Sequence, residues 1–470
     1  MTGHAKKSGI VRTLIDNSFL LVAGAVIALV WANLAQPDAD GKTSYSRIFE
    51  FDLTSLWTEH GPEPAAADAS NAASGLAADE ASAGAAPEPS STGHAEDDHG
   101  GDGTHTAAAA DGHSDSEHAG HHGLTLHFII NDILMALFFA IAAKEVWESL
   151  LPGGALSNPR KAATPLLATV GGIVGPALIY LAGSYFTGTQ DVLGKGWAVP
   201  CATDIAFSYL VARFIFGAGH PAIAFLLLLA IADDAAGLMI LAIFYPQAPI
   251  VPAWLLLTVV SMLGAVLLHR LKVHSHWYYL AGPGVLCWFS FYQANIHPAL
   301  GLVPIIPLLP HAQTDLGFYA REELSRHDTL NEFEHFWKTP VEYFLGLFGL
   351  ANAGVVMSSL GTGTWLVLAG LLIGKPVGIT LLTLLAEKGF KLEKPVGMDY
   401  RHVITLGMVA GIGFTVALFV SVAAFTTPGA TQDSVKMGAL LSFAAAPLAI
   451  ILGRVLGLRA LKTVAVDEPE

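Results

Sequence analysis

The sequence has little charge and almost no cysteine, and it lacks any motif for holding a nucleotide. Lys, Arg, Asp and Glu together make up 13% of its 470 residues. The two cysteines, Cys201 and Cys287, both fall in apolar stretches and provide neither a disulfide framework nor a zinc site. There is no GxxxxGK[ST] phosphate loop and no large soluble domain. If the chain transports a solute, an ion gradient must therefore supply the energy.

Hydrophobic residues are abundant instead, at 53% of the chain, and they come in runs long enough to cross a bilayer. This pattern predicts an all-α integral membrane protein with about twelve transmembrane helices. The predicted spans are 17–35, 126–150, 164–185, 198–212, 220–245, 253–268, 277–293, 297–309, 341–358, 364–385, 402–425 and 435–456.

The basic residues indicate the orientation. With the N-terminus inside, 18 of the 24 Lys and Arg fall in cytoplasmic segments, four fall outside, and Lys144 and Lys375 lie within spans. We therefore expect both termini to be cytoplasmic. The first run resembles a signal peptide, but its apolar core is long, which favours a retained span.

An acidic insert separates the first two spans. Residues 59–123 contain 13 Asp and Glu, no Lys or Arg, and seven His after His60. This composition favours a disordered outer loop, and weak binding of zinc, nickel or copper is the alternative. The predicted organisation is 1–58 with the first helix, 59–123 as the insert, 124–458 as the core of helices 2–12, and 459–470 as a cytoplasmic tail.

Two adjacent carboxylates interrupt the run FLLLLAIADDAAGLMILAIF at residues 225–244. Each Asp at a helix centre costs about 3 kcal/mol on an insertion scale, whereas a large apolar residue returns about 0.5 kcal/mol. The summed insertion free energy of the segment is close to zero, so its insertion depends on neighbouring helices. Asp233 and Asp234 are therefore candidate functional residues.

Two other spans contain residues that interrupt helices. In GWAVPCATDIAF, Pro200 removes a backbone donor just before Thr203 and Asp204. The late span GMVAGIGFTVALF is rich in glycine. A proline kink and a glycine packing face would explain both, but paired broken helices also mark substrate sites in transporters. Asp204 follows the proline closely, and together with the pair at Asp233 and Asp234 it favours a substrate site.

Lys375 lies near the middle of the tenth span and requires an anionic partner or the loss of its proton. Neighbouring helical residues point about 100° apart, so Asp233 and Asp234 cannot both face one cavity squarely. We expect one to face the ion path and the other Lys375. Ala230 and Gly237 beside Asp234 predict the close approach of another helix.

Several stretches, in order along the chain, carry a resemblance to a known family. The sequence is similar to sodium/proton antiporters of the NhaA type over nearly all of the chain outside the insert. The matching stretches are INDILMALFFAIAAKEV, VGPALIY, GWAVPCATDIAF, LAIADDAAGLMILAIFY, IHPALGLVPI, GLANAGVVMS, GLLIGKPVGI and GIGFTVALFV.

The resemblance implies a twelve-helix fold with inverted repeats, in which the unwound fourth and eleventh helices cross at mid-membrane. It implies that Asp234 is the main Na⁺ ligand and that Asp233 is the acid paired with Lys375. It further implies that Thr203 contributes a polar group and that Asp204 balances the charge of the facing helix ends. Asp132 also matches an acid of the family.

The chemistry expected at such a site is exchange. Buried, crowded carboxylates hold either protons or a small hard cation such as Na⁺ or Li⁺, and competition for one alternately exposed site is antiport. If Lys375 releases its proton when Asp233 binds the ion, more than one proton moves per Na⁺ and the cycle is electrogenic. We expect no cofactor, no enzymatic activity and no nucleic-acid partner, and a location in the bacterial inner membrane.

Two departures from the family pattern bear on regulation and assembly. The second helix ends in KEVWESL at residues 144–150, which keeps Glu145, a candidate with Asp132 for the pH response, but changes the charges after it. The insert replaces a short hairpin used for dimer contact, although we still expect a homodimer. A sodium-coupled symporter and a non-transporting metal or pH sensor are the alternative functions. The sequence leaves open the preference among Na⁺, Li⁺ and K⁺.

Overall fold

A computed structural model describes residues 19–35, 43–55, 124–311 and 328–458. The chain divides into two units, one comprising residues 1–51 and 125–470 and the other 52–124. In the second unit, the Leu53 amide donates a hydrogen bond to the Leu124 carbonyl at 3.0 Å. The acidic insert predicted at 59–123 and the two chain termini lie outside the described residues.

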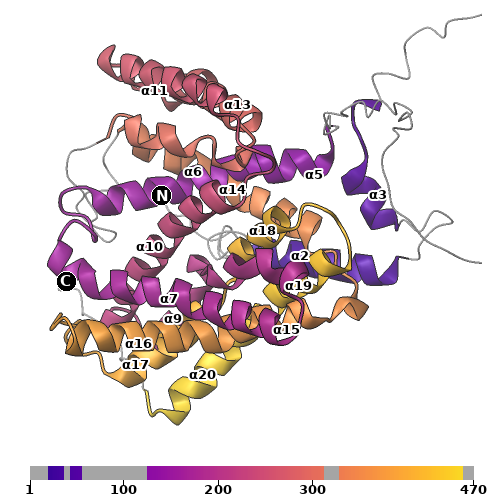
Figure 1. The fold of residues 1–470 in the computed structure, drawn as a ribbon. Helices are drawn as coiled ribbons and strands as arrows, with labels where there is room; N and C mark the ends of the chain where they lie inside the picture. Colours follow the sequence, from indigo (N-terminus) through magenta and orange to yellow (C-terminus); the bar gives the residue numbers. More distant parts are fainter. Residues whose placement is uncertain (1–18, 36–42, 56–123, 312–327, 459–470) are drawn as a thin grey trace, which may run out of the picture. The chain divides into compact units, whose positions relative to one another are not determined.

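The described part of the first unit is built from helices and contains no strand (Figure 1). Its α-helices are α2 (Phe19–Leu34), α3 (Ser44–Glu50), α5 (Leu126–Phe128), α6 (Met135–Leu150), α7 (Pro159–Phe186), α8 (Gln190–Leu193), α9 (Ile205–Phe216), α10 (Pro221–Phe244), α11 (Leu255–Arg270), α12 (His276–Tyr279), α13 (Val285–Gln293), α14 (Thr329–Asn352), α15 (Thr362–Ala369), α16 (Lys375–Lys388), α17 (Tyr400–Ala410), α18 (Phe414–Ala424), α19 (Ala430–Leu441) and α20 (Ala445–Val455).

Short π- and 3₁₀-helical segments join several of these helices end to end. The π segments are η1 (Ile129–Leu134), η4 (Leu280–Gly284) and η9 (Gly370–Gly374). The 3₁₀ segments are η2 (Gly194–Cys201), η3 (Pro252–Trp254), η5 (Pro298–Leu300), η6 (Val303–Leu308), η8 (Met357–Ser359) and η10 (Ser442–Ala444).

Within the described ranges, six helices are long and apolar enough to cross a membrane, and eight if each of two bent pairs counts as one span. Large apolar side chains on these helices point outward, for example Phe186 at 84% exposure and Leu256 at 70%. Such surfaces are stable in lipid rather than in water. The prediction of a helical membrane protein is confirmed at this level.

Two predicted spans differ in form from the helices in the structure. Residues 297–309 form the 3₁₀ segments η5 and η6, because prolines at 298, 304 and 307 remove the donors that an α-helix needs. The span predicted at 341–358 belongs to α14, which begins at Thr329 and ends at Asn352. A search for apolar runs missed the start of α14 because its first turns contain polar residues.

Two spans are interrupted by short non-helical segments. The helical run Gln190–Cys201 bends by 53° into α9, and α17 bends by 49° into α18. The two interruptions touch, because the Asp204 amide donates a hydrogen bond to the Ile412 carbonyl at 2.7 Å. The first break lies at residues 202–204, after Pro200, and not at the proline itself. Pro200 is accommodated within η2.

Glycines let α7 and the η9–α16 segment pack backbone against backbone. A Cβ on Gly378 would lie 2.0 Å from the Gly171 carbonyl oxygen, and a Cβ on Gly175 would lie 2.3 Å from that of Gly374. Small residues at such crossings are typical of membrane helices. The close packing carries Lys375, the first residue of α16, into the interior.

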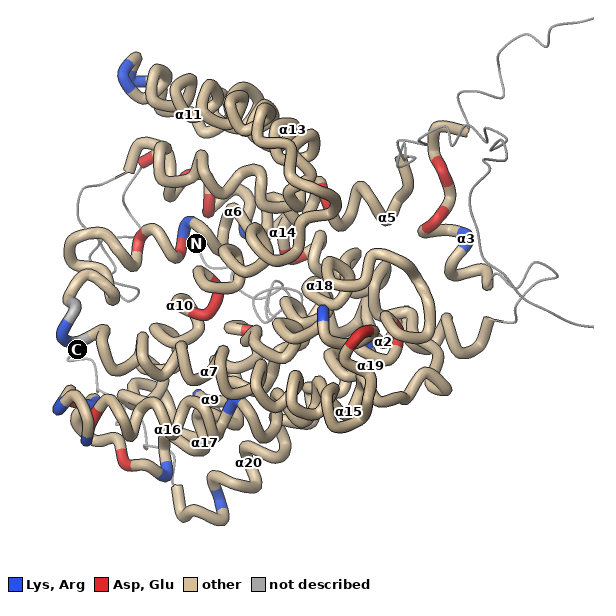
Figure 2. Tube along the Cα trace, in the orientation of Figure 1, with Lys and Arg blue, Asp and Glu red and all other residues tan. Residues whose placement is uncertain are grey.

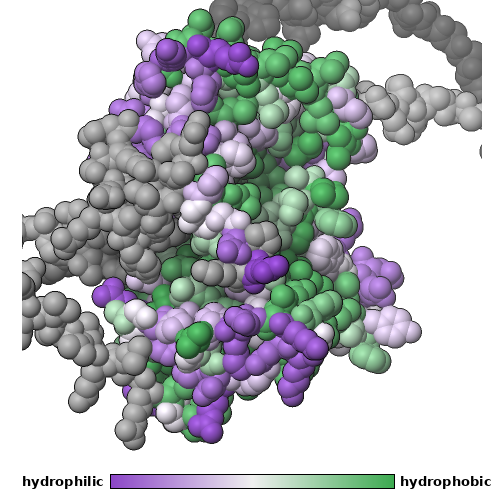
Figure 3. Space-filling view, turned by 90° about the vertical axis from the view of Figure 1, so that its left-hand side faces the viewer, coloured by the Kyte–Doolittle hydropathy of each residue, from purple (hydrophilic) through white to green (hydrophobic). Residues whose placement is uncertain are grey.

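Charged side chains are concentrated at helix ends. Figure 2 shows Lys and Arg at the ends of α11, α16 and α20, and each of these helices has a basic residue in its last turn. The face shown in Figure 3 carries hydrophilic patches among hydrophobic residues. Within the helices, the acids of α10 stand out in an otherwise uncharged stretch (Figure 2).

Candidate functional site

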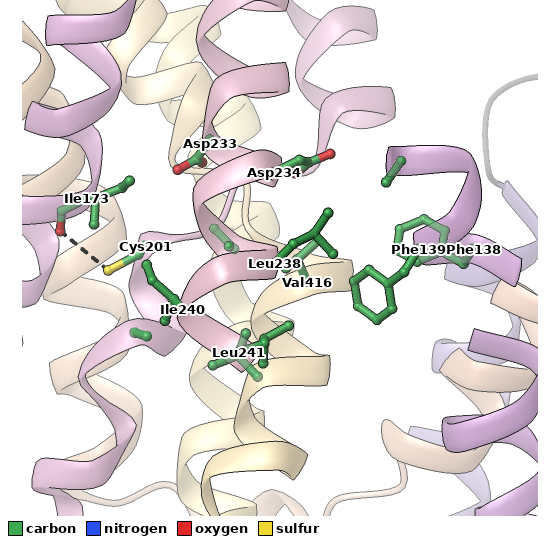
Figure 4. A pocket seen from close by; sticks show the side chains of 15 residues that line it. Phe138, Phe139, Ile173, Cys201, Asp233, Asp234, Leu238, Ile240, Leu241 and Val416 are labelled. Atoms are coloured by element: carbon green, nitrogen blue, oxygen red, sulfur yellow. Dashed lines mark hydrogen bonds between the residues drawn. The ribbon is translucent and has the colours of Figure 1, made fainter. Parts of the chain in front are cut away.

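The acid pair lies in the middle of α10, and its two side chains leave the helix on different sides. Asp233 points toward the side that holds Cys201 and Ile173, whereas Asp234 points toward Phe138 and Phe139 (Figure 4). This divergence follows from the 100° rotation between neighbouring residues of a helix. The two carboxylates therefore meet different neighbours.

Asp233 lies at the centre of a buried polar network. Its Oδ2 atom is 3.1 Å from Lys375 Nζ and accepts a hydrogen bond from the Thr203 hydroxyl at 2.7 Å. Lys375 also donates to the Cys201 carbonyl, which the end of η2 leaves without a helical partner. The ammonium, at 0% exposure, is thus held by one carboxylate and one carbonyl.

The two helix breaks supply the remaining polar groups. The Thr203 hydroxyl also lies 3.2 Å from the Ala410 carbonyl, at the end of α17. Asp204 is the N-cap of α9, where its Oδ1 accepts from the Phe207 amide at 3.2 Å, and its Oδ2 accepts from the Thr415 hydroxyl in α18. The side chain of Asp204 therefore caps α9 and contacts the first turn of α18.

Asp234 lines two cavities. The larger, of about 190 Å³, is lined by Thr203, Asp204 and Asp234 together with residues of α6, α14 and α18. The smaller, of about 30 Å³, is lined by both acids of the pair and otherwise mainly by apolar side chains. It has room for roughly one water molecule or a bare small cation.

Gly237 borders the smaller cavity, and no atom beyond its own helix turn lies within 4 Å of where its Cβ would be. The expectation that Gly237 lets another helix approach closely was therefore wrong. Its missing side chain leaves open space one turn from Asp234. Ala230, by contrast, is fully buried.

The larger cavity is strongly acidic. Five carboxylates and one ammonium line it, namely those of Glu145, Asp204, Asp234, Glu334, Glu342 and Lys338. An excess of one sign of charge on the walls of a low-dielectric cleft concentrates counter-ions, here cations. The cavity is therefore suited to drawing a small cation toward Asp234.

Lys144 joins two helices at the border of this cavity. Its ammonium contacts Glu334 of α14 and, one turn along α6, Glu148. Lys338 lies 3.7 Å from the other oxygen of Glu334 but is 67% exposed. Lys144 is therefore buried, and its charge is compensated by ion pairs within α6 and between α6 and α14.

The two acids expected to take part in a pH response occupy different places. Glu145 lines the larger cavity together with Asp234. Asp132 lines neither cavity and lies in η1, with Oδ1 3.5 Å from His297 Nδ1 and its backbone carbonyl bonded to Trp288 Nε1 at 2.8 Å. The structure thus brings only Glu145 to the acid pair.

Sequence reasoning missed three contributors to the site. Thr415 lies within the quoted stretch GMVAGIGFTVALF, but nothing in the sequence indicated that its hydroxyl bonds Asp204. Glu334 lies in the first half of α14, before the predicted span 341–358, whereas Glu342 lies inside that span but was not singled out. A search for acids upstream of residue 341 would have found Glu334.

Among the described residues, no three His, Cys, Asp or Glu are arranged to hold a resident metal ion. The His-rich stretch between residues 94 and 122 lies outside the described part of the chain. A cation at the acid pair would instead have few protein ligands, all of them oxygens. Such a site suits a transported hard ion better than a tightly held one.

Two interrupted spans that touch at their breaks, beside a pair of acids in mid-helix and a buried lysine, define a secondary transporter class of membrane protein. A family profile described as "Na+/H+ antiporter 1" matches residues 106–456. The chain belongs to this Na⁺/H⁺ antiporter family.

Curated relatives cover most of the chain. An antiporter named Na(+)/H(+) antiporter NhaA from Jannaschia sp. (strain CCS1) is 53% identical over 372 residues, covering 74% of this chain and 88% of the relative. Relatives of the same name from Geotalea uraniireducens and Desulfitobacterium hafniense are 52% and 50% identical, each covering 72% of this chain and 87% of its own length.

Proposed function

We propose that the protein is a secondary active antiporter that exchanges cytoplasmic Na⁺ or Li⁺ for external protons, for sodium and pH homeostasis. The observation that carries the proposal is the carboxylate of Asp234, which lines two cavities and is next in sequence to Asp233, the partner of Lys375 in an ion pair. The chain's membership of the Na⁺/H⁺ antiporter family supports it.

The site can hold its two substrates only in turn. Asp234 and Asp233 provide carboxylate oxygens, and the Thr203 hydroxyl lies 2.7 Å from Asp233. A bound Na⁺ needs these acids ionised, whereas protons neutralise them. Because burial of an isolated charge is costly, the empty site takes up protons before it reorients.

Lys375 sets the number of protons in this scheme. When Na⁺ draws Asp233 into its coordination, the ammonium loses its carboxylate partner, and the buried site then favours a neutral amine. Release of that proton together with the one on Asp234 makes the exchange electrogenic. Asp204 compensates the partial charges of the helix ends at the two breaks.

In the proposed topology, twelve helices cross the bacterial inner membrane and both termini are cytoplasmic. The fourth span comprises η2 and α9, the eleventh α17 and α18, and the two cross at mid-membrane as parts of inverted repeats. Basic residues at the ends of α9, α11, α16 and α20 support this orientation, since all four ends are then cytoplasmic. The larger cavity opens to the cytoplasm.

Regulation and assembly are proposed on the same basis. Glu145, in the wall of the cytoplasmic cavity, responds to pH together with Asp132. The protein forms a homodimer, needs no cofactor, and catalyses no chemical reaction. The 59–123 segment binds transition metals weakly at most.

The experiment is proton flux in everted vesicles with an imposed proton gradient. Addition of Na⁺ or Li⁺ should dissipate the gradient in the wild type and not in Asp234→Asn, which keeps the size of the side chain but not its charge. Asp191→Asn is the control, because Asp191 is exposed at the start of α8. Full activity of Asp234→Asn, or flux that needs an organic co-substrate, would overturn the proposal.

A further inference from the structure

Gly237 lies one helical turn after the acid pair, and the local structure does not require glycine there. No atom beyond its own helix turn lies within 4 Å of where its Cβ would be, so packing does not exclude a side chain. Its backbone is ordinary α-helix rather than the left-handed conformation that favours glycine. Glycine inside a helix lowers stability relative to alanine. Neither packing nor backbone conformation therefore accounts for this glycine, which indicates a functional reason.

A side chain at position 237 would lie against both acids. Gly237 follows Asp233 by four residues and Asp234 by three, and these are the spacings at which side chains are neighbours on a helix. The Cα–Cβ bonds of a helix tilt toward its N-terminus, so a side chain at this position would project back toward the two carboxylates. The lack of one leaves space next to the acid pair.

The smaller cavity, of about 30 Å³, occupies this space. The residues of α10 that line it are the two acids and the positions that follow them, namely Asp233, Asp234, Gly237, Leu238, Ile240 and Leu241. Figure 4 shows Leu238, Ile240 and Leu241 on the turns beyond the acids. Asp234 is the only residue of α10 that lines the larger cavity. The smaller cavity therefore extends from the acids along the second half of α10.

The side chains that line the smaller cavity offer few oxygen ligands. Besides the two acids, the polar side chain among these described residues is Cys201, whose thiol donates to the Ile173 carbonyl at 3.4 Å (Figure 4). A thiol is a soft ligand and suits an alkali cation poorly. Oδ2 of Asp233 is already shared by Lys375 Nζ and the Thr203 hydroxyl. A hard cation at this place therefore meets only a few carboxylate oxygens.

Such a cation needs a further oxygen ligand, and the cavity has room for one. A volume of about 30 Å³ accommodates roughly one water molecule. A water molecule between apolar walls is stable only if it has polar partners, and here the cation and the carboxylates provide them. The space beside Gly237 can therefore hold a water molecule that accompanies the ion.

We propose that Gly237 determines ion selectivity, because it leaves room for one water molecule that stays bound to the transported cation at the acid pair. Carboxylate oxygens and this water together provide the ligands for Na⁺. Li⁺ is smaller and needs fewer ligands, so it depends less on the water. Selectivity among hard cations follows cavity size and ligand number in the same way elsewhere. This inference rests on the proposed function, because the cation is the ion that the antiporter transports.

The test compares two side chains that fill the space differently. Gly237→Ala displaces the water with a methyl group and preserves the helix, because alanine is the stronger helix former. In everted vesicles, it should raise the half-saturating Na⁺ concentration about tenfold relative to that for Li⁺, since the lost ligand is not replaced. Gly237→Ser fills the same space but supplies a hydroxyl oxygen. Its ratio of the Na⁺ to the Li⁺ value should stay within about threefold of the wild type.

Gly264→Ala in α11 is the matched control. It makes the same change within a helix, its Cβ would lie 3.7 Å from the nearest atom, in the Pro283 ring, and Gly264 lines neither cavity. Both half-saturating concentrations should match those of the wild type. Stabilisation of the purified proteins by Na⁺ and by Li⁺ in detergent gives the two affinities independently of transport.

The inference is overturned if Gly237→Ala changes the Na⁺ and Li⁺ affinities equally, changes neither, or weakens Li⁺ more than Na⁺. A Gly237→Ser protein that discriminates between the ions as Gly237→Ala does would overturn it as well, because the hydroxyl would then not replace a water ligand. Failure of the proposed function would look different, since the wild type itself would show no Na⁺- or Li⁺-dependent flux.

Discussion

Lys375 and Asp233 form an ion pair between α16 and α10, with 3.1 Å between Nζ and Oδ2 and side-chain exposures of 0% and 3%. Neither charge has contact with solvent, so each depends on the other. Burying both charges costs desolvation energy, and the resulting pair can respond to a bound ion.

Removal of Lys375 alone should be more damaging than removal of both charges. Lys375→Met leaves the Asp233 carboxylate buried without its partner and should lower the free energy of unfolding by about 3–5 kcal/mol. Asp233→Asn with Lys375→Met should recover more than 1 kcal/mol of this loss. Thermal unfolding of the purified proteins in detergent measures both. Equal stability of the single and double variants would mean that the pair is not coupled.

The Thr203 hydroxyl should be needed for ion affinity. Thr203→Val removes the hydrogen bond of 2.7 Å to Asp233 at nearly constant volume. Loss of about 1.4 kcal/mol corresponds to a tenfold rise in the Na⁺ concentration for half-maximal flux. Thr203→Ser keeps the hydroxyl and should stay near the wild type. If the Ser and Val variants behave alike, the hydroxyl has no part in binding.

The contact between Lys144 and Glu334 should hold α6 to α14. Lys144→Met should destabilise the protein by about 1–3 kcal/mol, because it leaves two glutamates facing each other across a buried position. Lys338→Met, which removes a 67% exposed partner of the same Glu334, should change stability by less than about 1 kcal/mol.

A charge exchange tests the same contact. Lys144→Glu and Glu334→Lys should each lower stability and Na⁺-dependent flux, and the double variant should restore part of both. Stability is measured by unfolding in detergent and flux in vesicles. A double variant as impaired as the worse single variant would show that the ion pair is not what these residues contribute.

The glycine crossing of α7 and α16 should tolerate no side chain. Gly378→Ala would place a Cβ 2.0 Å from the Gly171 carbonyl oxygen, so the helices must separate at a cost of about 1–3 kcal/mol or more. Gly264→Ala in α11 is the control, since its nearest neighbour would be the Pro283 ring at 3.7 Å. Melting temperatures in detergent distinguish them, and a Gly378→Ala protein as stable as Gly264→Ala would contradict the packing.

The sequence by itself determined the class of protein and most of the site. Apolar runs locate helices because a bilayer requires about twenty apolar residues for a span, and charge within such a run is rare enough to be informative. Asp233, Asp234 and Lys375 were identified on that ground alone. The 100° rotation per residue was enough to predict that the two acids face different neighbours.

Only the tertiary structure decided which groups meet. The hydrogen bond from Asp204 to Ile412 joins residues 208 positions apart, and no local pattern encodes that pairing. Gly237 was misjudged because a glycine permits either close packing or open space, and the neighbouring helices determine which occurs. Lys144 gained its partner Glu334 from a helix whose polar first turns concealed it. Local energetics therefore fix the helices and mark costly charges, whereas packing between distant segments decides how those charges are compensated.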